Sequence, residues 1–408
     1  MRYPRHNIFY ILIVISVFSL SLSGCGHQKL NVKDLLNQPI EELGHYNSSK
    51  KYKKFGVTVV YLTGTPYEIG LAHGKLCREE ILEINKPIFE IYHGMTEESK
   101  HHWLSKIEKL EKQIPAEYIA EMHGIADGSK LEYNEILFLN TASTISEGKG
   151  CFSFSYRDKN SRIITFRQGD LFAEVPLYKT MILYIIKPDK GHGFAAILNP
   201  GWVDGESGMN ENGVTVAQNN ISIEQTEWQV MPITILSRYI LQYSKTIEEA
   251  DQLLNRQKKY PARLLFVSSK KSATVFEIAN SDKAQLDMED GYLATANHAR
   301  IIPSQPVSGS SHSRLEYANQ FLSKKSANMD IYKGIELVRS NKISRRWTWR
   351  VQNRLSFIFS PSTLDFWIAI PPNSDYLPAS YGPFVGFNLM HELYGYSYKP
   401  NPDSIPAY

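Results

Sequence analysis

Three shortages narrow the classes of protein to which this chain can belong. Its 408 residues include three cysteines, too few for a disulfide framework or a four-cysteine zinc site. The net charge of +3 is too small for the basic field that binds nucleic acid. Internal repeats and low-complexity tracts are also lacking. Since 42% of the residues are hydrophobic, the chain can still bury one or two cores. Any special chemistry must then depend on one or two cysteines.

Residues 1–24 have the pattern of an export signal. Arg2 and Arg5 precede an apolar run that ends at Leu22, and this run is shorter than the ~20 residues of a membrane span. It continues into Ser-Gly-Cys25, which resembles the lipobox of bacterial lipoproteins. We therefore expect an exported lipoprotein of the cell envelope, held on the membrane by acyl chains such as palmitate on Cys25. The alternative is an ordinary signal peptide that happens to contain a cysteine.

The rest of the chain changes character along its length. Residues 25–54 are polar and lysine-rich, and we interpret them as a membrane tether. Residues 55–150 show one strand pattern at 56–62 and then mostly helical spacing. Residues 151–408 begin with recurrent strand patterns, interrupted by helices, which indicates an α+β fold with layered packing. Within this part, 376–408 is rich in aromatic residues, glycine and proline, and we expect ordered loops there.

A predicted hairpin places chemistry near one cysteine. Cys151 begins a strand, and the turn sequence Asp-Lys-Asn-Ser at 158–161 joins it to the next strand. If Arg157 pairs with Arg162, Cys151 faces Gln168 across the hairpin. The hairpin alone leaves open whether the cysteine is reactive or a small buried core residue.

Several polar residues near the ends of these strands could serve a reactive thiol. Arg167 and Asp170 lie within a residue or two of the partner of Cys151, and a nearby cation gives a thiol more thiolate character. Two further strands end in the amides Asn220 and Asn297. Side-chain amides can stabilise an oxyanion if they point into a cleft, although loop asparagines commonly cap their own backbone.

Taken together, the motifs resemble those of a known enzyme family. Their order is similar to that of N-terminal-nucleophile (Ntn) hydrolases of the penicillin acyltransferase type, an autoproteolytic cysteine family related to bile salt hydrolases. The matching stretches are Gly64–Gly70 with His73-Gly74, Glu121–Gly128, Gly150-Cys151, Phe166–Asp170, Asn210–Asn220, Thr295–His298 and Ser311–Arg314. Each motif is weak alone, but their joint order is specific. The resemblance implies a four-layer αββα sandwich with a mostly helical N-terminal segment.

The resemblance also implies a role for each matched position. Cys151 would be the nucleophile, released as a new N-terminus by autocleavage of the Gly150–Cys151 bond. The two cleavage fragments would stay associated. Arg167 and Asp170 would position the nucleophile and its amine. Asn220 would be the oxyanion asparagine, Asn297 a second active-site asparagine and Arg314 the late arginine of the site. Many penicillin acyltransferase relatives have Gln-Asn-Trp-Asp at 167–170, and the arginine here is closer to the bile salt hydrolase pattern. The substrate therefore cannot be taken from either branch.

An N-terminal cysteine can supply both nucleophile and base. Its thiol has a pKa of about 8.5 and its α-amine one of about 7.7–8.0, so the amine can accept the thiol proton near neutral pH. We expect a hydrolase or acyltransferase that acts on linear non-peptide C–N amide bonds of small molecules through a Cys151 acyl-enzyme. We expect no cofactor, metal or nucleic acid.

Two alternatives to this enzyme stay open. The first is a surface binding lipoprotein that keeps the fold without catalysis. The second is a papain-like cysteine protease, although Cys151 lies in Gly-Cys-Phe-Ser-Phe and lacks the helical cysteine signature of that class. A metal hydrolase is less well supported, because the chain has no His-Glu-x-x-His motif.

Overall fold

The computed structural model describes residues 32–145, 150–172, 182–304, 310–325, 328–344, 351–371 and 377–397. The predicted export signal, Cys25 and the first residues of the predicted tether lie outside these ranges. Within the described ranges, no helix combines the length and the apolar character needed to cross a membrane.

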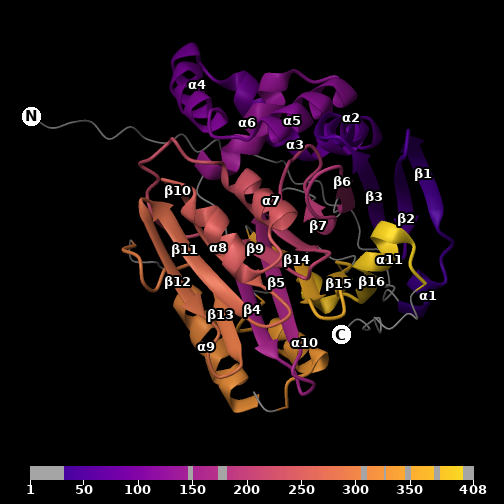
Figure 1. Ribbon diagram of the computed structural model, residues 1–408, viewed down its shortest axis with the longest axis vertical. Coiled ribbons are helices and arrows are strands. Elements are labelled where there is room, and N and C mark those ends of the chain that lie inside the picture. The colour runs from indigo at the N-terminus through magenta and orange to yellow at the C-terminus, as the bar shows by residue number, and fades with distance from the viewer. Residues whose placement is uncertain are drawn as a thin grey trace, which may run out of the picture.

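Two sheets lie face to face in the centre of the molecule (Figure 1). Sheet A runs in the order β1 (Glu41–Tyr46), β2 (Ser49–Lys54), β3 (Val57–Gly64), β6 (Ile182–Pro188), β7 (Phe194–Leu198), β8 (Ser207–Asn210), β9 (Thr215–Asn219), β10 (Tyr260–Ser268), β11 (Ala273–Asn280) and β12 (Asp282–Asp287). Sheet B runs β13 (Tyr292–Thr295), β4 (Cys151–Arg157), β5 (Ile163–Phe172), β14 (Val351–Ser360), β15 (Asp365–Ala369) and β16 (Phe384–Asn388). The strands pair antiparallel except β3 and β6, which are parallel. Apolar side chains of both sheets, such as Val59 and Phe357, form one core between them.

Helices cover the outer face of each sheet. The helices that share a core with sheet A are α2 (Pro66–Leu76), α3 (Arg78–Gly94), α4 (Glu97–Glu111), α5 (Ala116–Ser129), α6 (Tyr133–Ile145), α7 (Ile233–Tyr243) and α8 (Ile247–Asn255). Sheet B packs against α9 (Ser311–Lys325) and α10 (Ile331–Arg339). The short elements are α1 (Val32–Leu36), the 3-10 helix η3 (Ala379–Tyr381) and α11 (Leu389–Tyr394). The helix–sheet–sheet–helix order confirms the predicted α+β class and its four αββα layers.

The helical N-terminal part is held by a close crossing of α2 and α5, which lie at one end of the molecule (Figure 1). Gly70 and Gly74 of α2 face Gly124 and Gly128 of α5. A Cβ on Gly70 would lie 1.9 Å from a backbone oxygen of α5, and one on Gly124 would lie 2.3 Å from a backbone oxygen of α2. Only glycine permits this backbone approach. The glycine-bearing motifs in the first half of the chain are therefore packing motifs.

Two sequence-based predictions for the chain ends differ from the structure. Residues 41–54, which their composition assigned to a tether, form the β1–β2 hairpin, and β2 pairs with β3. Exposed lysines are typical of strands near a sheet edge, so this segment has no apolar face by which to recognise a strand. In the region expected as loops, Phe384–Asn388 forms β16 and Leu389–Tyr394 forms α11.

Candidate active site

Cys151 is the first residue of β4, and β4 lies between β13 and β5 in sheet B. Its thiol is free, and the residue is 4% exposed. Ser153 shares the face of Cys151 and donates from Oγ to Asn219 Oδ1 of β9 at 2.8 Å, so this face is turned toward sheet A. The alternate residues Phe152 and Phe154 pack in the core with α9 and α10. The pleat of β4 therefore directs the thiol between the two sheets.

The β4–β5 hairpin differs by one residue from the predicted register. Cys151 lies opposite Gly169, one residue beyond its predicted partner. The predicted four-residue turn is instead a three-residue loop, closed by the Asp158 N–H donating to the Arg162 carbonyl at 2.8 Å. Ser161 adopts φ +61° in this loop, as the last residue of a three-residue hairpin loop does.

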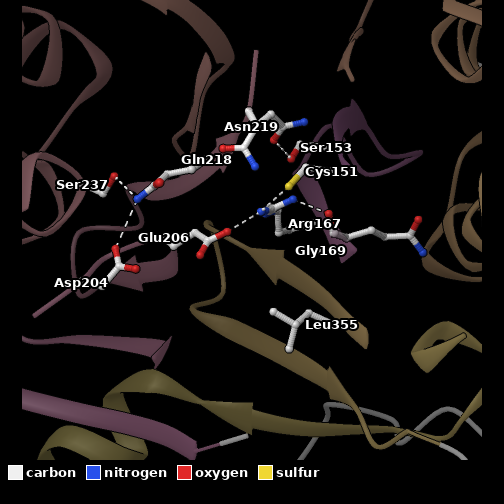
Figure 2. A network of polar contacts seen from close by, with 12 residues as sticks. Cys151, Ser153, Arg167, Gly169, Asp204, Glu206, Gln218, Asn219, Ser237 and Leu355 are labelled. Carbon is white, nitrogen blue, oxygen red and sulfur yellow. Dashed lines mark hydrogen bonds and ion pairs between the residues drawn. The ribbon is translucent and has the colours of Figure 1, made fainter. Parts of the chain in front are cut away.

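The actual register decides whether an arginine reaches the thiol. Arg167 lies opposite Ser153 and so projects from the same face as Cys151. In the predicted register it would have projected from the opposite face. Arg167 Nη2 donates to Cys151 Sγ at 3.2 Å and to Glu206 Oε1 at 2.7 Å, as Figure 2 shows. The guanidinium itself is buried.

The charges around the thiol oppose one another. Burial raises the pKa of Cys151, the Arg167 guanidinium lowers it, and the carboxylates of Glu206 and Asp170 raise it again. The net direction is upward. In the uncut chain the thiol is therefore protonated at neutral pH, and Arg167 is the group that favours its thiolate.

The backbone of Cys151 is held at both ends. Its N–H donates to Asn297 Oδ1 at 2.8 Å, and its carbonyl oxygen accepts from Arg314 Nη1 at 2.7 Å. Arg314 Nη2 also donates to Asn297 Oδ1 at 2.7 Å. Asn297 lies just after β13, and Arg314 lies in the first turn of α9. Residues far apart in sequence thus fix the position of one cysteine.

Asp170 and Gly150 meet at the predicted cleavage bond. The Asp170 N–H donates to the Gly150 carbonyl oxygen at 2.8 Å. A Cβ on Gly150 would lie 2.4 Å from Asp170 Oδ2, so any residue other than glycine requires this carboxylate or the Gly150 backbone to move. The carbonyl that precedes Cys151 is therefore polarised by a fixed backbone donor.

The two asparagines at the end of β9 differ in their contacts. Asn220 is partly exposed, and its carbonyl oxygen accepts from Asn297 Nδ2 at 3.0 Å. Asn219 is fully buried and donates to the Ala296 carbonyl at 2.9 Å while it accepts from Ser153. Asn219 therefore joins the two sheets, and Asn220 is linked to Cys151 through Asn297.

The structure thus brings every predicted site residue of the described chain to one place, while their catalytic roles stay predictions. The sequence reasoning missed Glu206. The signal that could have indicated it is the acidic pair in Asp204-Gly205-Glu206, just ahead of β8.

The sequence reasoning also missed a serine and a histidine that hold Asn297. Ser311 Oγ accepts from the Asn297 N–H at 2.8 Å and lies 2.7 Å from His298 Nδ1. Because Oγ accepts from the amide, its own hydrogen is available to His298. The imidazole ring of His298 lies 3.9 Å from that of His312. Burial, with a smaller effect of His312, lowers the pKa of His298 to about 4, so this ring is neutral near pH 7.

A family model describes most of this site. The model of the acyl-coenzyme A:6-aminopenicillanic acid acyl-transferase family matches residues 157–375. The chain belongs to this family. The family predicted from the motifs is therefore confirmed, whereas the lipoprotein prediction is not tested.

Proteins similar to this chain come from distantly related organisms. An uncharacterised protein of Archaeoglobus fulgidus is 24% identical over 305 residues, which cover 61% of this chain and 51% of that protein. The acyl-coenzyme A:6-aminopenicillanic-acid-acyltransferase 40 kDa form of Emericella nidulans is 23% identical over 271 residues, 62% of this chain and 75% of that protein. The beta-alanyl-dopamine/carcinine hydrolase of Drosophila melanogaster is 23% identical over 227 residues, 50% and 58% respectively. The chain thus spans about half of the archaeal relative.

Two solved structures can be compared with this family member. The Caenorhabditis elegans ortholog of N-acylethanolamine-hydrolyzing acid amidase gives a TM-score of 0.44 at 16% identity and covers 55% of this chain and 96% of its own. A mutant conjugated bile acid hydrolase of Clostridium perfringens gives 0.44 at 9% identity, with 58% and 92% covered.

Proposed function

We propose that this chain is an autoproteolytic cysteine Ntn hydrolase or acyltransferase that acts on linear non-peptide C–N amide bonds of small molecules. The observation that carries the proposal is the three-way hold on Cys151. Asn297 holds its nitrogen, Arg314 its carbonyl oxygen and Arg167 its sulfur. Two relatives named as an acyltransferase and as a hydrolase support the reaction class.

Autocleavage would convert the backbone nitrogen of Cys151 into a catalytic amine. The thiol attacks the Gly150 carbonyl carbon, whose oxygen already accepts from the Asp170 N–H. The peptide C–N bond breaks as a thioester forms, and the thiol proton passes to the leaving Cys151 nitrogen. Water then hydrolyses the thioester, which leaves a Gly150 carboxylate and a free thiol at a new N-terminus.

Catalysis would repeat this chemistry on a substrate amide. The freed amine, held by Asn297 Oδ1, accepts the thiol proton, and Arg167 stabilises the thiolate. The sulfur attacks the carbonyl carbon of the substrate amide, and the C–N bond breaks as the acyl-enzyme thioester forms. The amine of the substrate leaves with the proton that the Cys151 amine had accepted. Water or another acceptor then takes the acyl group from the sulfur. Asn220 is the proposed donor to the oxyanion, a contact whose loss typically costs ~2.7–4 kcal/mol of transition-state stabilisation.

We also propose that Cys25 carries the lipid that anchors the enzyme to the cell envelope. The support is the sequence Leu22-Ser23-Gly24-Cys25 after a short apolar run. Cys25→Ala should move the protein from the membrane fraction to the soluble fraction when it is expressed in a bacterium. Unchanged membrane association would contradict the lipid anchor without touching the proposed chemistry.

Mass spectrometry of the purified chain tests the enzyme proposal. Wild-type protein should separate into fragments that end at Gly150 and begin at Cys151, and incubation with a panel of N-acyl amides should add an acyl group to the second fragment. Cys151→Ala should stay whole and unmodified. Cys77→Ala is the matched control, because Cys77 is also buried and free but lies between α2 and α3. A whole wild-type chain without any acyl adduct would overturn the proposal.

A further inference from the structure

A carboxylate outside the family motifs lies beside the nucleophile. Glu206 Oε1 accepts from Arg167 Nη2 at 2.7 Å, and the same nitrogen donates to Cys151 Sγ at 3.2 Å. Figure 2 shows the Glu206 side chain extending toward Arg167 from the segment ahead of β8. One guanidinium nitrogen therefore joins the carboxylate to the thiol, and Glu206 lies within a small molecule's length of the reacting atom.

Glu206 is also accessible to a ligand, unlike the cations around it. Its side chain is 35% exposed, whereas that of Arg167 is 1% exposed. Arg263 and Arg314 are buried as well. Among the described residues, none donates a hydrogen bond to the second carboxylate oxygen of Glu206, Oε2. Within the described part of the chain, a molecule that reaches the thiol therefore meets the Glu206 carboxylate as an acceptor, while the guanidinium groups of Arg167, Arg263 and Arg314 are covered.

The neighbouring Asp204 adds no second accessible charge. Its Oδ1 accepts from the Gly205 N–H at 2.6 Å and from Gln218 Nε2 at 3.2 Å, and the residue is buried. Burial and the nearby Glu206 raise the pKa of Asp204 well above its usual range. The carboxyl of Asp204 is thus fixed by the protein, and Glu206 alone of this acidic pair can bind a ligand.

We propose that Glu206 selects the substrate by binding a positively charged group, such as an ammonium, close to the scissile amide. The inference rests on the proposed function and names its substrate class: amides with a cationic group near the reacting bond, in preference to those with a carboxylate or sulfonate there. An ammonium can donate to Oε2 and pair with the carboxylate, as charge-assisted hydrogen bonds do. The Glu206 carboxylate repels an anionic group at the same place, and this repulsion adds to the preference for cationic substrates.

Two sets of matched amides test this inference on the full-length, self-cleaved protein. In one set the amine part ends in an ammonium, a hydroxyl or a carboxylate, and in the other set the acyl part carries these ends. Wild-type enzyme should have a kcat/KM about tenfold or more higher for the ammonium than for the hydroxyl compound in one set, and the carboxylate compound should be poorest. The set that shows the preference identifies which side of the amide Glu206 binds.

Glu206→Gln should bring the ammonium-to-hydroxyl ratio close to one, because the amide keeps an acceptor for Arg167 but loses the charge. Glu211→Gln is the matched control, since Glu211 contacts Tyr394 and the Gly193 N–H; it should keep the wild-type ratio. Competition by propylammonium, propanol and propionate on wild-type enzyme gives the same comparison without any variant, with propylammonium expected to compete best.

The outcomes separate this inference from the proposed function. Acyl adducts on Cys151 with a wild-type ratio near one in both sets would overturn the selection of cations. A ratio that persists in Glu206→Gln would assign the preference to another residue and also overturn it. No adduct on Cys151 with any amide would instead overturn the proposed function, and the selection with it.

Discussion

Arg167 Nη2 lies 3.2 Å from the sulfur of Cys151, on the neighbouring strand of the same hairpin. Both residues are buried, so the thiol has a fixed cation beside it. Such a cation is what a thiolate nucleophile needs in a buried place, because burial by itself raises the pKa of the thiol.

Removal of the Arg167 charge should raise the pKa of the Cys151 thiol. Arg167→Gln is expected to lower kcat/KM by about tenfold to a hundredfold, the size of a lost charge-assisted hydrogen bond. The pH dependence of alkylation by iodoacetamide should move to higher pH. Arg162→Gln is the control, because Arg162 pairs with Asp158 at the other end of the same hairpin. An unchanged alkylation profile in Arg167→Gln would contradict the role of the cation.

Removal of the Glu206 charge should act on the thiol in the opposite direction. The Glu206 carboxylate raises the pKa of Cys151, so Glu206→Gln should shift the alkylation profile to lower pH. A shift to higher pH would mean instead that Glu206 mainly keeps Arg167 in place. The measurement is the rate of alkylation against pH, with the adduct located at Cys151 by mass spectrometry.

A side chain at position 150 should block autocleavage. A Cβ there would lie 2.4 Å from Asp170 Oδ2, so Gly150→Ala has to displace either the carboxylate or the carbonyl that the thiol attacks. We expect an uncut chain on a denaturing gel. Gly94→Ala is the matched control, because a Cβ at Gly94 has no atom within 4 Å. Cleavage of Gly150→Ala at the wild-type rate would exclude this close contact as a constraint.

Ser311 should act on catalysis through Asn297. Ser311→Ala removes the acceptor of the Asn297 N–H and the partner of His298 Nδ1. We expect kcat to fall by roughly fivefold with little change in KM, because a ~1 kcal/mol hydrogen bond that positions Asn297, the partner of the amine, is lost. The pH profile of kcat should shift too, since Asn297 contacts the nitrogen that becomes the base. Ser311→Thr should restore both kcat and its pH profile. A loss of folded protein without any shift in the pH profile of kcat would indicate a purely structural role.

Two buried histidines should make the fold sensitive to acid. Burial lowers the pKa of His73 to about 3 and that of His298 to about 4, from an ordinary value near 6.5. Both rings are therefore neutral in the folded state, and protonation favours unfolding. Stability is full above about pH 6.5 and should fall progressively as the pH drops toward 4 and then 3. The fully buried His73 alone can contribute several kcal/mol to this loss.

Urea unfolding of the uncut Cys151→Ala chain between pH 4 and 7 measures this effect. His73 Nε2 accepts from the Gly201 N–H at 2.9 Å, so His73→Gln should lower stability at pH 7 and flatten its dependence on pH. His101→Gln is the control, since His101 is exposed on α4. An equally steep pH dependence in His73→Gln would show that other groups dominate acid unfolding.

Some elements were predictable because their patterns are local. The β-branched run at 56–62 indicated a strand and corresponds to β3. The β1–β2 hairpin was missed because strands near a sheet edge expose polar side chains and so look like a linker. The strand β16, within the stretch 376–408 that was expected as loops, was also missed, since aromatic residues with glycine and proline suit loops as well as buried strands.

The register of the β4–β5 hairpin shows what a local sequence pattern cannot determine. The sequence allows a four-residue turn at 158–161 as well as a three-residue loop, and both use favourable turn residues. The choice depends on contacts formed on folding: Asp158 Oδ1 accepts from the N–H groups of Asn160 and Arg162, and Ser161 takes φ +61°. This single-residue difference determines which side chain of β5 faces the thiol.

The sequence by itself determined the order of the motifs and the α+β class, because these depend on residue type and local spacing, and the family resemblance predicted Cys151 as the nucleophile. Only the tertiary structure decided which groups touch Cys151. Arg167 reaches the sulfur through strand register, and Asn297 and Arg314 reach the backbone through the packing of β13 and α9. Glu206 entered the site in the same way. Such contacts join residues far apart in the chain, and their geometry exists only once the two sheets have packed.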